Sequence, residues 1–361
     1  MKKSLLALAV LGAYAGVASA QSSVTIFGVV DLSINNVKNG SLRTTEMASN
    51  QLNSNRFGLR GFEDLGGGLG AGFWLEAGMN NGVGDAGGGS GNVANVANTA
   101  PSSQLFNRRS TVSLFSQAAG EVRLGRDYTP TFWNLAYFDV YGANGIGNDT
   151  NLISLAGPTT STAGTGVRAN NSVGYHLPGN LGGFYGQGMY ALGQGNDNNK
   201  YWGLRGGFAT GPFDVALAYG ETTTVLPEKL KVTNIGGSWN FGFLKMFLLW
   251  NNQKFGGLKE DYWGLGASLP LGQGEFKAMY GSVKDSGTQG AVTIRNADAT
   301  TWSLQYIYNL SKRTALYGGY ASIDNDPNSF RTVLGGSIGS TAASLAGKKS
   351  DAFNVGVRHS F

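Results

Sequence analysis

The sequence has 361 residues, including 58 glycines and no cysteine, and its formal net charge at pH 7 is +5. Charged residues make up 14% of the chain, below the roughly 25% of ordinary soluble domains. The lack of cysteine excludes a disulfide scaffold, an iron–sulfur cluster and a cysteine-ligated zinc. After residue 20, the sequence contains no apolar run near the ~20 residues that a transmembrane helix needs.

The first 20 residues have the three parts of a secretory signal. A basic start, Met1-Lys2-Lys3, precedes an apolar stretch and the small-residue site Ala18-Ser19-Ala20. We therefore predict a cleaved signal peptide at 1–20 and a mature chain at 21–361. Its removal lowers the net charge from +5 to +3, and no run of basic residues marks a nucleic-acid surface. Whether Gln21 cyclises at the new terminus stays open.

From Val24 to the C-terminus, apolar side chains recur at every second position. In one example Trp302, Leu304, Tyr306 and Tyr308 alternate with polar residues, and helical spacing is not sustained anywhere. The alternating segments are longer than the usual strand of about 5–6 residues. They are long enough to cross a membrane at a tilt.

Short turns and long polar loops alternate along the chain. Seven tight turns rich in Gly, Pro, Asn and Ser separate long loops at roughly 35–51, 80–105, 129–167, 193–199, 222–229, 254–259, 285–297 and 324–350. Eight long loops and seven turns join sixteen strands, with both termini on the short-turn side. A soluble sandwich is the alternative, but strict alternation is typical of outer-membrane barrels. We predict an all-β fold, a 16-stranded antiparallel transmembrane β-barrel.

Several segments resemble the trimeric porins of beta-proteobacteria and Neisseria. These are Gln21–Asp31, Asn55–Gly61, Glu63–Gly66, Asn107–Val112 and Gly120–Pro130, together with a final strand that ends in Phe361. The resemblance extends over the whole mature chain. One departure is Ser116-Gln117-Ala118, where the family often has a glycine-rich turn.

The resemblance implies a homotrimer in the outer membrane of a Gram-negative bacterium, with one water-filled pore in each subunit. The third long loop, here 129–167, would fold into the barrel and constrict the pore. The second, 80–105, would reach over a neighbouring subunit. Phe361 would be the assembly signal that the barrel-assembly machinery reads, and outer-membrane lipid and lipopolysaccharide would surround the wall.

Strand parity indicates which charged side chains face the pore, because successive side chains of a strand point to opposite faces. Phe57 and Leu59 have lipid-facing parity, for example, so their neighbours Arg56 and Arg60 face the lumen. The same argument on other strands adds Arg109, Glu121, Arg123, Arg168 and Arg205. The family motif implies that Arg126 also reaches the lumen. Arg108 shares the lipid-facing parity, and whether it faces the lumen stays open.

Asp127, Asp139 and Asp149 lie at or within the third loop. Our hypothesis is a transverse field, with arginines on the wall and loop carboxylates opposite. The alternative is that each arginine pairs with a nearby acid and holds the loop in place. The arginine excess favours anions. The loop also carries many aromatic residues, which either pack against the wall or form a sliding surface for sugars.

We predict a porin for passive diffusion of small hydrophilic solutes and ions, with an anion preference and no enzymatic activity. A solute-selective channel for phosphate, dicarboxylates or a sugar is one alternative. A mainly structural or adhesive surface barrel is another. We expect no cofactor and no catalytic metal, although a structural calcium ion between loop carboxylates such as Asp324 and Asp326 stays open.

Overall fold

The computed structural model describes residues 23–82, 104–155, 164–193, 200–224, 226–334 and 345–361. The predicted signal peptide, Gln21 and most of the 80–105 loop lie outside these ranges. The strands are β1 (Ser23–Asn39), β2 (Leu42–Ser49), β3 (Arg56–Gly66), β4 (Leu69–Gly78), β5 (Arg109–Ser116), β6 (Gly120–Tyr128), β7 (Arg168–His176), β8 (Phe184–Ala191), β9 (Tyr201–Thr210), β10 (Phe213–Thr223), β11 (Lys229–Asn240), β12 (Lys245–Phe255), β13 (Leu258–Leu271), β14 (Gly274–Gln289), β15 (Val292–Ile294), β16 (Ala299–Asn309), β17 (Thr314–Asn325) and β18 (Ser350–Ser360). Two helices are described, α2 (Pro130–Phe138) and the short 3₁₀ helix η2 (Asp149–Asn151).

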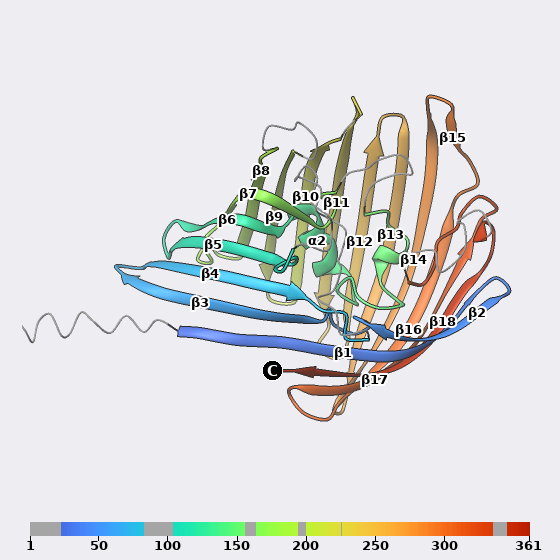
Figure 1. The fold of residues 1–361 in the computed structure, drawn as a ribbon, viewed down its shortest axis with the longest axis horizontal. Helices are drawn as coiled ribbons and strands as arrows, with labels where there is room; N and C mark the ends of the chain where they lie inside the picture. Colours follow the sequence, from blue (N-terminus) through green and yellow to red (C-terminus); the bar gives the residue numbers. More distant parts are fainter. Residues whose placement is uncertain (1–22, 83–103, 156–163, 194–199, 225, 335–344) are drawn as a thin grey trace, which may run out of the picture.

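Sixteen of these strands form one closed antiparallel ring (Figure 1). Each pairs with its neighbours in the chain, and β1 closes the ring by pairing with both β3 and β18. The short strands β2 and β15 extend the hairpins that begin with β1 and β14. The predicted 16-stranded barrel is confirmed. Closure leaves no unpaired edge, as a spanning sheet requires in lipid.

Side chains alternate between the outer surface and the interior. On β13, Trp263 and Leu265 are exposed on the outside, whereas Glu260 and Tyr262 on the opposite parity are fully buried. At the closing seam, the backbone of Phe361 exchanges two hydrogen bonds with Gly28, at 3.0 and 3.1 Å. A Cβ on Gly28 would lie 2.3 Å from the Phe361 ring, so glycine is required there for the terminal aromatic to pack.

Three of the predicted long loops are not long loops in the structure: two contain strand hairpins and one is a tight turn. The 35–51 segment is a hairpin of β1 and β2, and 285–297 contains the hairpin of β14 and β15. The predicted loop at 254–259 is a tight turn at Gly256-Gly257 between β12 and β13. Composition suggested loops because these segments are polar. Polar strands pair equally well once they extend into water beyond the membrane.

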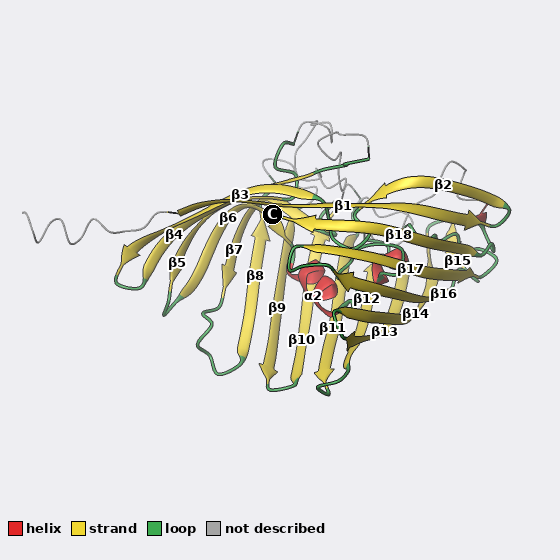
Figure 2. Ribbon diagram, turned by 90° about the horizontal axis from the view of Figure 1, so that it is seen from below, coloured by secondary structure: helices red, strands yellow, loops and turns green. Residues whose placement is uncertain are grey.

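The loop that follows β6 folds into the barrel, as the sequence predicts. Its helix α2 lies within the ring of strands (Figure 2) and contacts β8 to β12. The helix begins after Thr129, whose hydroxyl accepts a hydrogen bond from the Phe132 N–H, with Pro130 in the first turn. Asn134 anchors it to the wall through Asn234, at 2.8 Å. Neither described helix is long and apolar enough to cross a membrane.

Candidate functional site: the pore constriction

Two cavities of about 580 and 650 Å³ meet inside the barrel. The larger lies among residues of the long loops, and the smaller extends toward Glu275, Asn309 and Arg358 near the short turns. Six residues line both cavities and therefore mark the narrow zone between them: Ser54, Arg108, Phe132, Ala143, Asn144 and Arg168. They come from the wall and from the folded-in loop, so this zone is the constriction.

The segment 50–55, which joins β2 to β3, forms the rim opposite the folded-in loop. The buried carboxylate of Asp31 accepts hydrogen bonds from the Leu52 and Asn53 N–H groups, at 2.6 and 2.5 Å. The segment is thereby drawn inward, and the Ser54 hydroxyl donates to the Asn144 side chain at 2.7 Å. Sequence reasoning missed this contribution. The sequence feature that could have indicated it is Asp31, a carboxylate on the inward-facing positions of β1 that needs hydrogen-bond donors.

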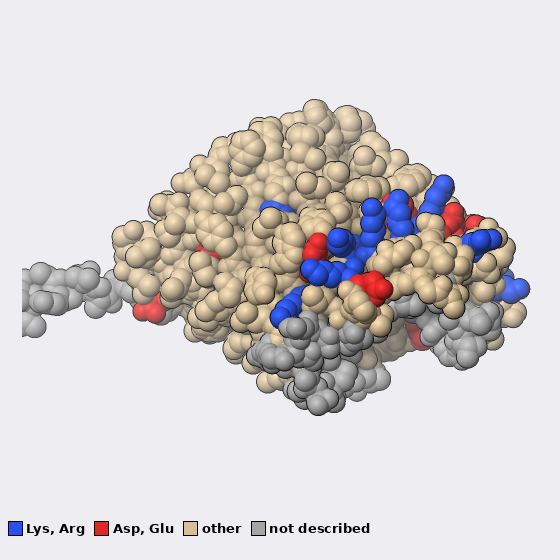
Figure 3. All heavy atoms as spheres, turned by 90° about the horizontal axis from the view of Figure 1, so that it is seen from above, with Lys and Arg blue, Asp and Glu red and all other residues tan. Residues whose placement is uncertain are grey.

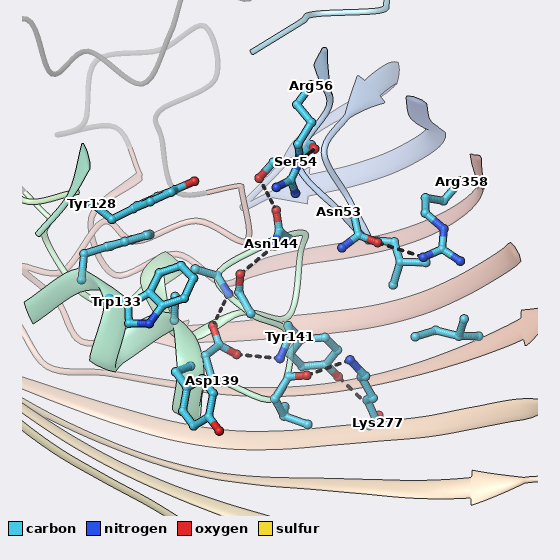
Figure 4. Close-up of a pocket in the computed structure, with 18 of the residues that line it drawn as sticks. Asn53, Ser54, Arg56, Tyr128, Trp133, Asp139, Tyr141, Asn144, Lys277 and Arg358 are labelled. Atoms are coloured by element: carbon cyan, nitrogen blue, oxygen red, sulfur yellow. Dashed lines mark hydrogen bonds between the residues drawn. The ribbon is translucent and has the colours of Figure 1, made fainter. Parts of the chain in front are cut away.

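Five basic side chains line the smaller cavity, together with the acids Asp139 and Glu275: Arg56, Arg108, Arg168, Lys277 and Arg358. Figure 4 shows Arg56, Arg358 and Lys277 on one side of this space. Arg358 donates to the Asn53 side chain at 3.2 Å, and Lys277 donates to the Val140 carbonyl at 2.9 Å. Sequence reasoning missed Lys277 and Arg358, although the outward parity of Phe276 and Val357 could have found both.

Arg108 faces the lumen, which answers the question left open by parity. It lies just before β5 begins, so the alternation of that strand does not apply to it. Its guanidinium pairs with Glu76 at 2.5 Å and donates to the Tyr128 hydroxyl at 2.6 Å. Arg168 donates to the same hydroxyl at 2.6 Å and stacks over that ring at 4.2 Å. Tyr128 thus holds two arginines at the constriction.

The other predicted arginines lie away from the narrow zone. Arg60, Arg109 and Arg123 line a hollow of about 410 Å³ together with Glu121. Arg123 pairs there with Glu121 at 2.6 Å and with Asp127 at 3.1 Å. These acids are on the same wall as the arginines, so this part of the lumen has paired charges.

Two predicted pore-lining arginines hold parts of the structure together. Arg205 lines a hollow of about 310 Å³ and donates to Asn134 of α2 at 2.8 Å, so it tethers the helix. Arg126 is buried and donates to the Asn107 carbonyl and the Asn170 side chain, both at 2.7 Å. A bulge at Gly125, where φ is +129°, removes Arg126 from the lipid-facing parity of its strand.

The loop carboxylates do not point across the pore at the arginines. Asp139 is buried and accepts hydrogen bonds from the backbone N–H groups of Tyr141, Ala143 and Asp149. Asp149 is also buried and accepts from the Tyr262 hydroxyl at 2.5 Å. Burial raises the pKa of Asp139 to about 6, and burial together with the nearby Asp139 charge raises the pKa of Asp149. These two acids therefore organise the loop, which differs from the transverse arrangement expected from the sequence.

The helix α2 has a wall side and a pore side. Leu135 and Phe138 are buried against the barrel wall. Trp133 and Tyr137 line the smaller cavity and remain 43% and 48% exposed. The aromatic residues of the loop therefore divide between packing, as expected, and an aromatic surface in the lumen.

Among the residues that the structure describes, no three His, Asp or Glu side chains gather where they could hold a metal ion. Asp324 instead pairs with Lys349 at 3.7 Å.

A family model described as "Gram-negative porin" matches residues 7–328. The chain belongs to the Gram-negative porin family. The porin is 37% identical to outer membrane porin protein 32 of Delftia acidovorans, and the match spans the full length of both chains. It is 29% identical to an outer membrane porin protein of Bordetella pertussis, again over both full chains. These relatives are channels, and the family places the porin in the outer membrane.

Solved structures agree with this fold. An anion-selective porin from Comamonas acidovorans superimposes with a TM-score of 0.78, at 34% identity, over 94% of this porin and 100% of that chain. OmpT of Vibrio cholerae in its trimer form superimposes with a TM-score of 0.66 at 14% identity, over 94% of this porin and 99% of that chain, which shows a common fold.

Proposed function

We propose that this porin is a general-diffusion channel that prefers anions. The observation that carries the proposal is the charge around the smaller cavity, which is lined by five basic side chains and two carboxylates, with Glu76 paired to Arg56 and Arg108. One of these carboxylates, Asp139, is already engaged by three backbone N–H groups. The lumen at the constriction is therefore positive, and a small hydrated anion is stabilised there relative to a cation. The anion selectivity printed for the Comamonas acidovorans porin supports the same direction.

The remaining parts of the proposal rest on the family resemblance. We infer that the mature porin is residues 21–361, exported by a cleaved signal at 1–20, and that it assembles as a homotrimer surrounded by outer-membrane lipid and lipopolysaccharide. Phe361 is proposed as the signal for the barrel-assembly machinery. The solute moves down its own gradient, so we propose no enzymatic activity and no cofactor.

The test is the reversal potential of the purified porin in a planar bilayer under a KCl gradient. We expect a steady ohmic conductance with a reversal potential that favours chloride. A reversal potential that favours potassium would contradict the anion preference. Absence of any conductance would contradict the open channel and favour a structural or adhesive role.

A second candidate function is selectivity for planar aromatic carboxylates. In Figure 4, Tyr128 and Trp133 lie on one side of the cavity and Arg358 and Lys277 on the other. An anion with a flat apolar body can stack on the aromatic side while its carboxylate meets the cations. A sugar gains less from Arg358 and Lys277, because these side chains carry N–H donors and no acceptor atom.

This candidate predicts that benzoate resides longer in the pore than cyclohexanecarboxylate, which has the same charge and similar size without the aromatic ring. We expect benzoate to interrupt the chloride current with a residence time about threefold to tenfold longer. Replacing Trp133 and Tyr137 with leucine should remove the difference and leave chloride selectivity intact. Trp263→Leu, on the outer surface, is the matched control. Equal residence times in the wild-type porin would contradict the candidate function.

A further inference from the structure

The folded-in loop places an asparagine directly before a glycine at the constriction. Asn144 lines both cavities, and its side-chain oxygen accepts a hydrogen bond from the Ser54 hydroxyl at 2.7 Å. Gly145 follows with a φ of +77°, and a Cβ there would lie 2.1 Å from the Gln51 carbonyl oxygen. Glycine is therefore required at this position, and no side chain shields the peptide nitrogen that joins it to Asn144.

An asparagine side chain can react with the next peptide nitrogen of its own chain. The nitrogen gives up its proton and bonds to Cγ, the Cγ–Nδ2 bond breaks, and the departing amide takes a proton and leaves as ammonia. Water then opens the five-membered succinimide ring to aspartate or isoaspartate. Water is the only co-reactant, and no oxidant or reductant takes part. Because ring closure is intramolecular, its rate depends on whether the nitrogen is free to approach the carbon.

Asn144 meets the requirements of this reaction. The peptide N–H of Gly145 has no acceptor among the residues that the structure describes. The Ser54 hydroxyl polarises the carbonyl that is attacked and stabilises the negative charge that develops on its oxygen. The Nδ2 group donates to the Gly142 carbonyl at 2.6 Å, so the carboxamide has a fixed orientation. The side chain borders the lumen, where water and hydroxide reach it.

A second Asn-Gly pair in the same chain provides a contrast. Asn39 also accepts a hydrogen bond from a serine hydroxyl, that of Ser350, at 2.6 Å. The N–H of Gly40, however, donates to the Lys349 carbonyl at 2.8 Å, in the turn between β1 and β2. Asn39 is also buried. Its neighbouring nitrogen is thus already engaged, and we expect this pair to react slowly.

We propose that Asn144 is a site of spontaneous deamidation, which places a carboxylate at the constriction and lowers the chloride-to-potassium permeability ratio as the porin ages. Figure 3 shows acidic side chains among the basic ones toward one end of the outer wall, so a carboxylate formed there would join an existing mixture of charges. The six residues that line both cavities, in contrast, include two arginines and no carboxylate. An added negative charge repels chloride and attracts potassium whatever the initial ratio, so the proposal does not depend on the anion preference of the pore.

The test ages the full-length mature porin in detergent micelles at physiological temperature and mildly alkaline pH. Peptide mapping by mass spectrometry measures the deamidated fraction at Asn144 and at Asn39. A sample unfolded in guanidinium chloride is aged in parallel. We expect Asn144 to react at least about tenfold faster than Asn39 in the folded porin, and the two to react at similar rates in the unfolded chain.

The electrical consequence is tested with Asn144→Asp, which produces the product directly. Its chloride-to-potassium permeability ratio should be lower than that of the wild type by about twofold or more, and the ratio of the ageing wild type should approach that value. Asn144→Gln, which could close only a six-membered ring, should keep its ratio on ageing. The control Asn180→Asp adds the same charge on an exposed turn outside both cavities and should leave the ratio unchanged.

Equal rates at Asn144 and Asn39 in the folded porin would overturn the assignment of the site, as would an unreacted Asn144 after the unfolded chain has deamidated. A wild-type permeability ratio in Asn144→Asp would overturn the effect on permeation. A potassium-favouring reversal potential of the unaged porin would contradict only the proposed anion preference, so the two failures are distinguishable.

Discussion

Neutralising Arg56, Lys277 and Arg358 with glutamine is expected to lower the chloride-to-potassium permeability ratio by about tenfold or more. All three line the smaller cavity, and none is the arginine that stacks on Tyr128. A unit charge about 8 Å from a permeating ion contributes roughly 1 kcal/mol at an effective dielectric of about 40. The effect has opposite sign for chloride and potassium. Each lost charge therefore lowers the chloride permeability and raises the potassium permeability, and both changes lower the ratio. The reversal potential under a KCl gradient measures the change.

Glutamine is chosen because it removes the charge and keeps a polar side chain with N–H donors at the positions where Arg358 and Lys277 donate to the Asn53 side chain and the Val140 carbonyl. The triple variant Lys312→Gln, Lys348→Gln, Lys349→Gln removes the same charge from exposed side chains that do not line the cavity, and it should keep the wild-type ratio. The decrease in the chloride-to-potassium ratio should be largest at low salt. The Debye length is about 10 Å at 0.1 M and grows as the salt concentration falls, so the charges are then screened less. An unchanged ratio in the cavity variant would show that the selectivity arises elsewhere on the wall.

Replacing Arg331 with alanine is expected to destabilise the barrel by roughly 3–5 kcal/mol and to release the folded-in loop. Arg331 donates to the Leu152 carbonyl of that loop at 2.6 Å and pairs with Glu260 and Asp285 at 3.1 and 2.8 Å. Glu260 in turn accepts from the Ser154 N–H at 3.1 Å. Removing the arginine leaves two carboxylates without their cation, one of them fully buried. Thermal unfolding in detergent and single-channel current noise should both report the change.

The matched control is Lys349→Ala, which breaks an exposed ion pair with Asp324 and should cost less than about 1 kcal/mol. The triple variant Glu260→Gln, Asp285→Asn, Arg331→Met removes the cation together with both charges that need it. It should recover most of the thermal stability, while the current remains noisier because the bond to Leu152 is gone. Wild-type stability and noise in Arg331→Ala would refute this role.

On regular strands, the side chains that parity assigns to the inner face lie beside interior cavities. Arg56, Arg60, Arg109, Arg123, Arg168 and Arg205 all line interior cavities, and the same rule applied to β14 and β18 would have added Lys277 and Arg358. The rule does not apply where a strand is interrupted. The bulge at Gly125 changes the direction of Arg126, and Arg108 precedes its strand altogether. Their roles in selectivity stay predictions until the variants are measured.

The sequence by itself determined the class of fold and the sixteen strands, because alternation with period two and the order of turns and loops are local properties of the chain. The inward path of the third loop followed from the resemblance to the porin family. Only the tertiary structure decided the geometry of the constriction. Asp149 contacts Tyr262, Arg331 contacts Leu152 and Tyr317 contacts Asp31, all pairs far apart in the chain. A buried loop carboxylate turns toward the nearest donors that can satisfy it, and those donors are positioned only when the barrel has closed.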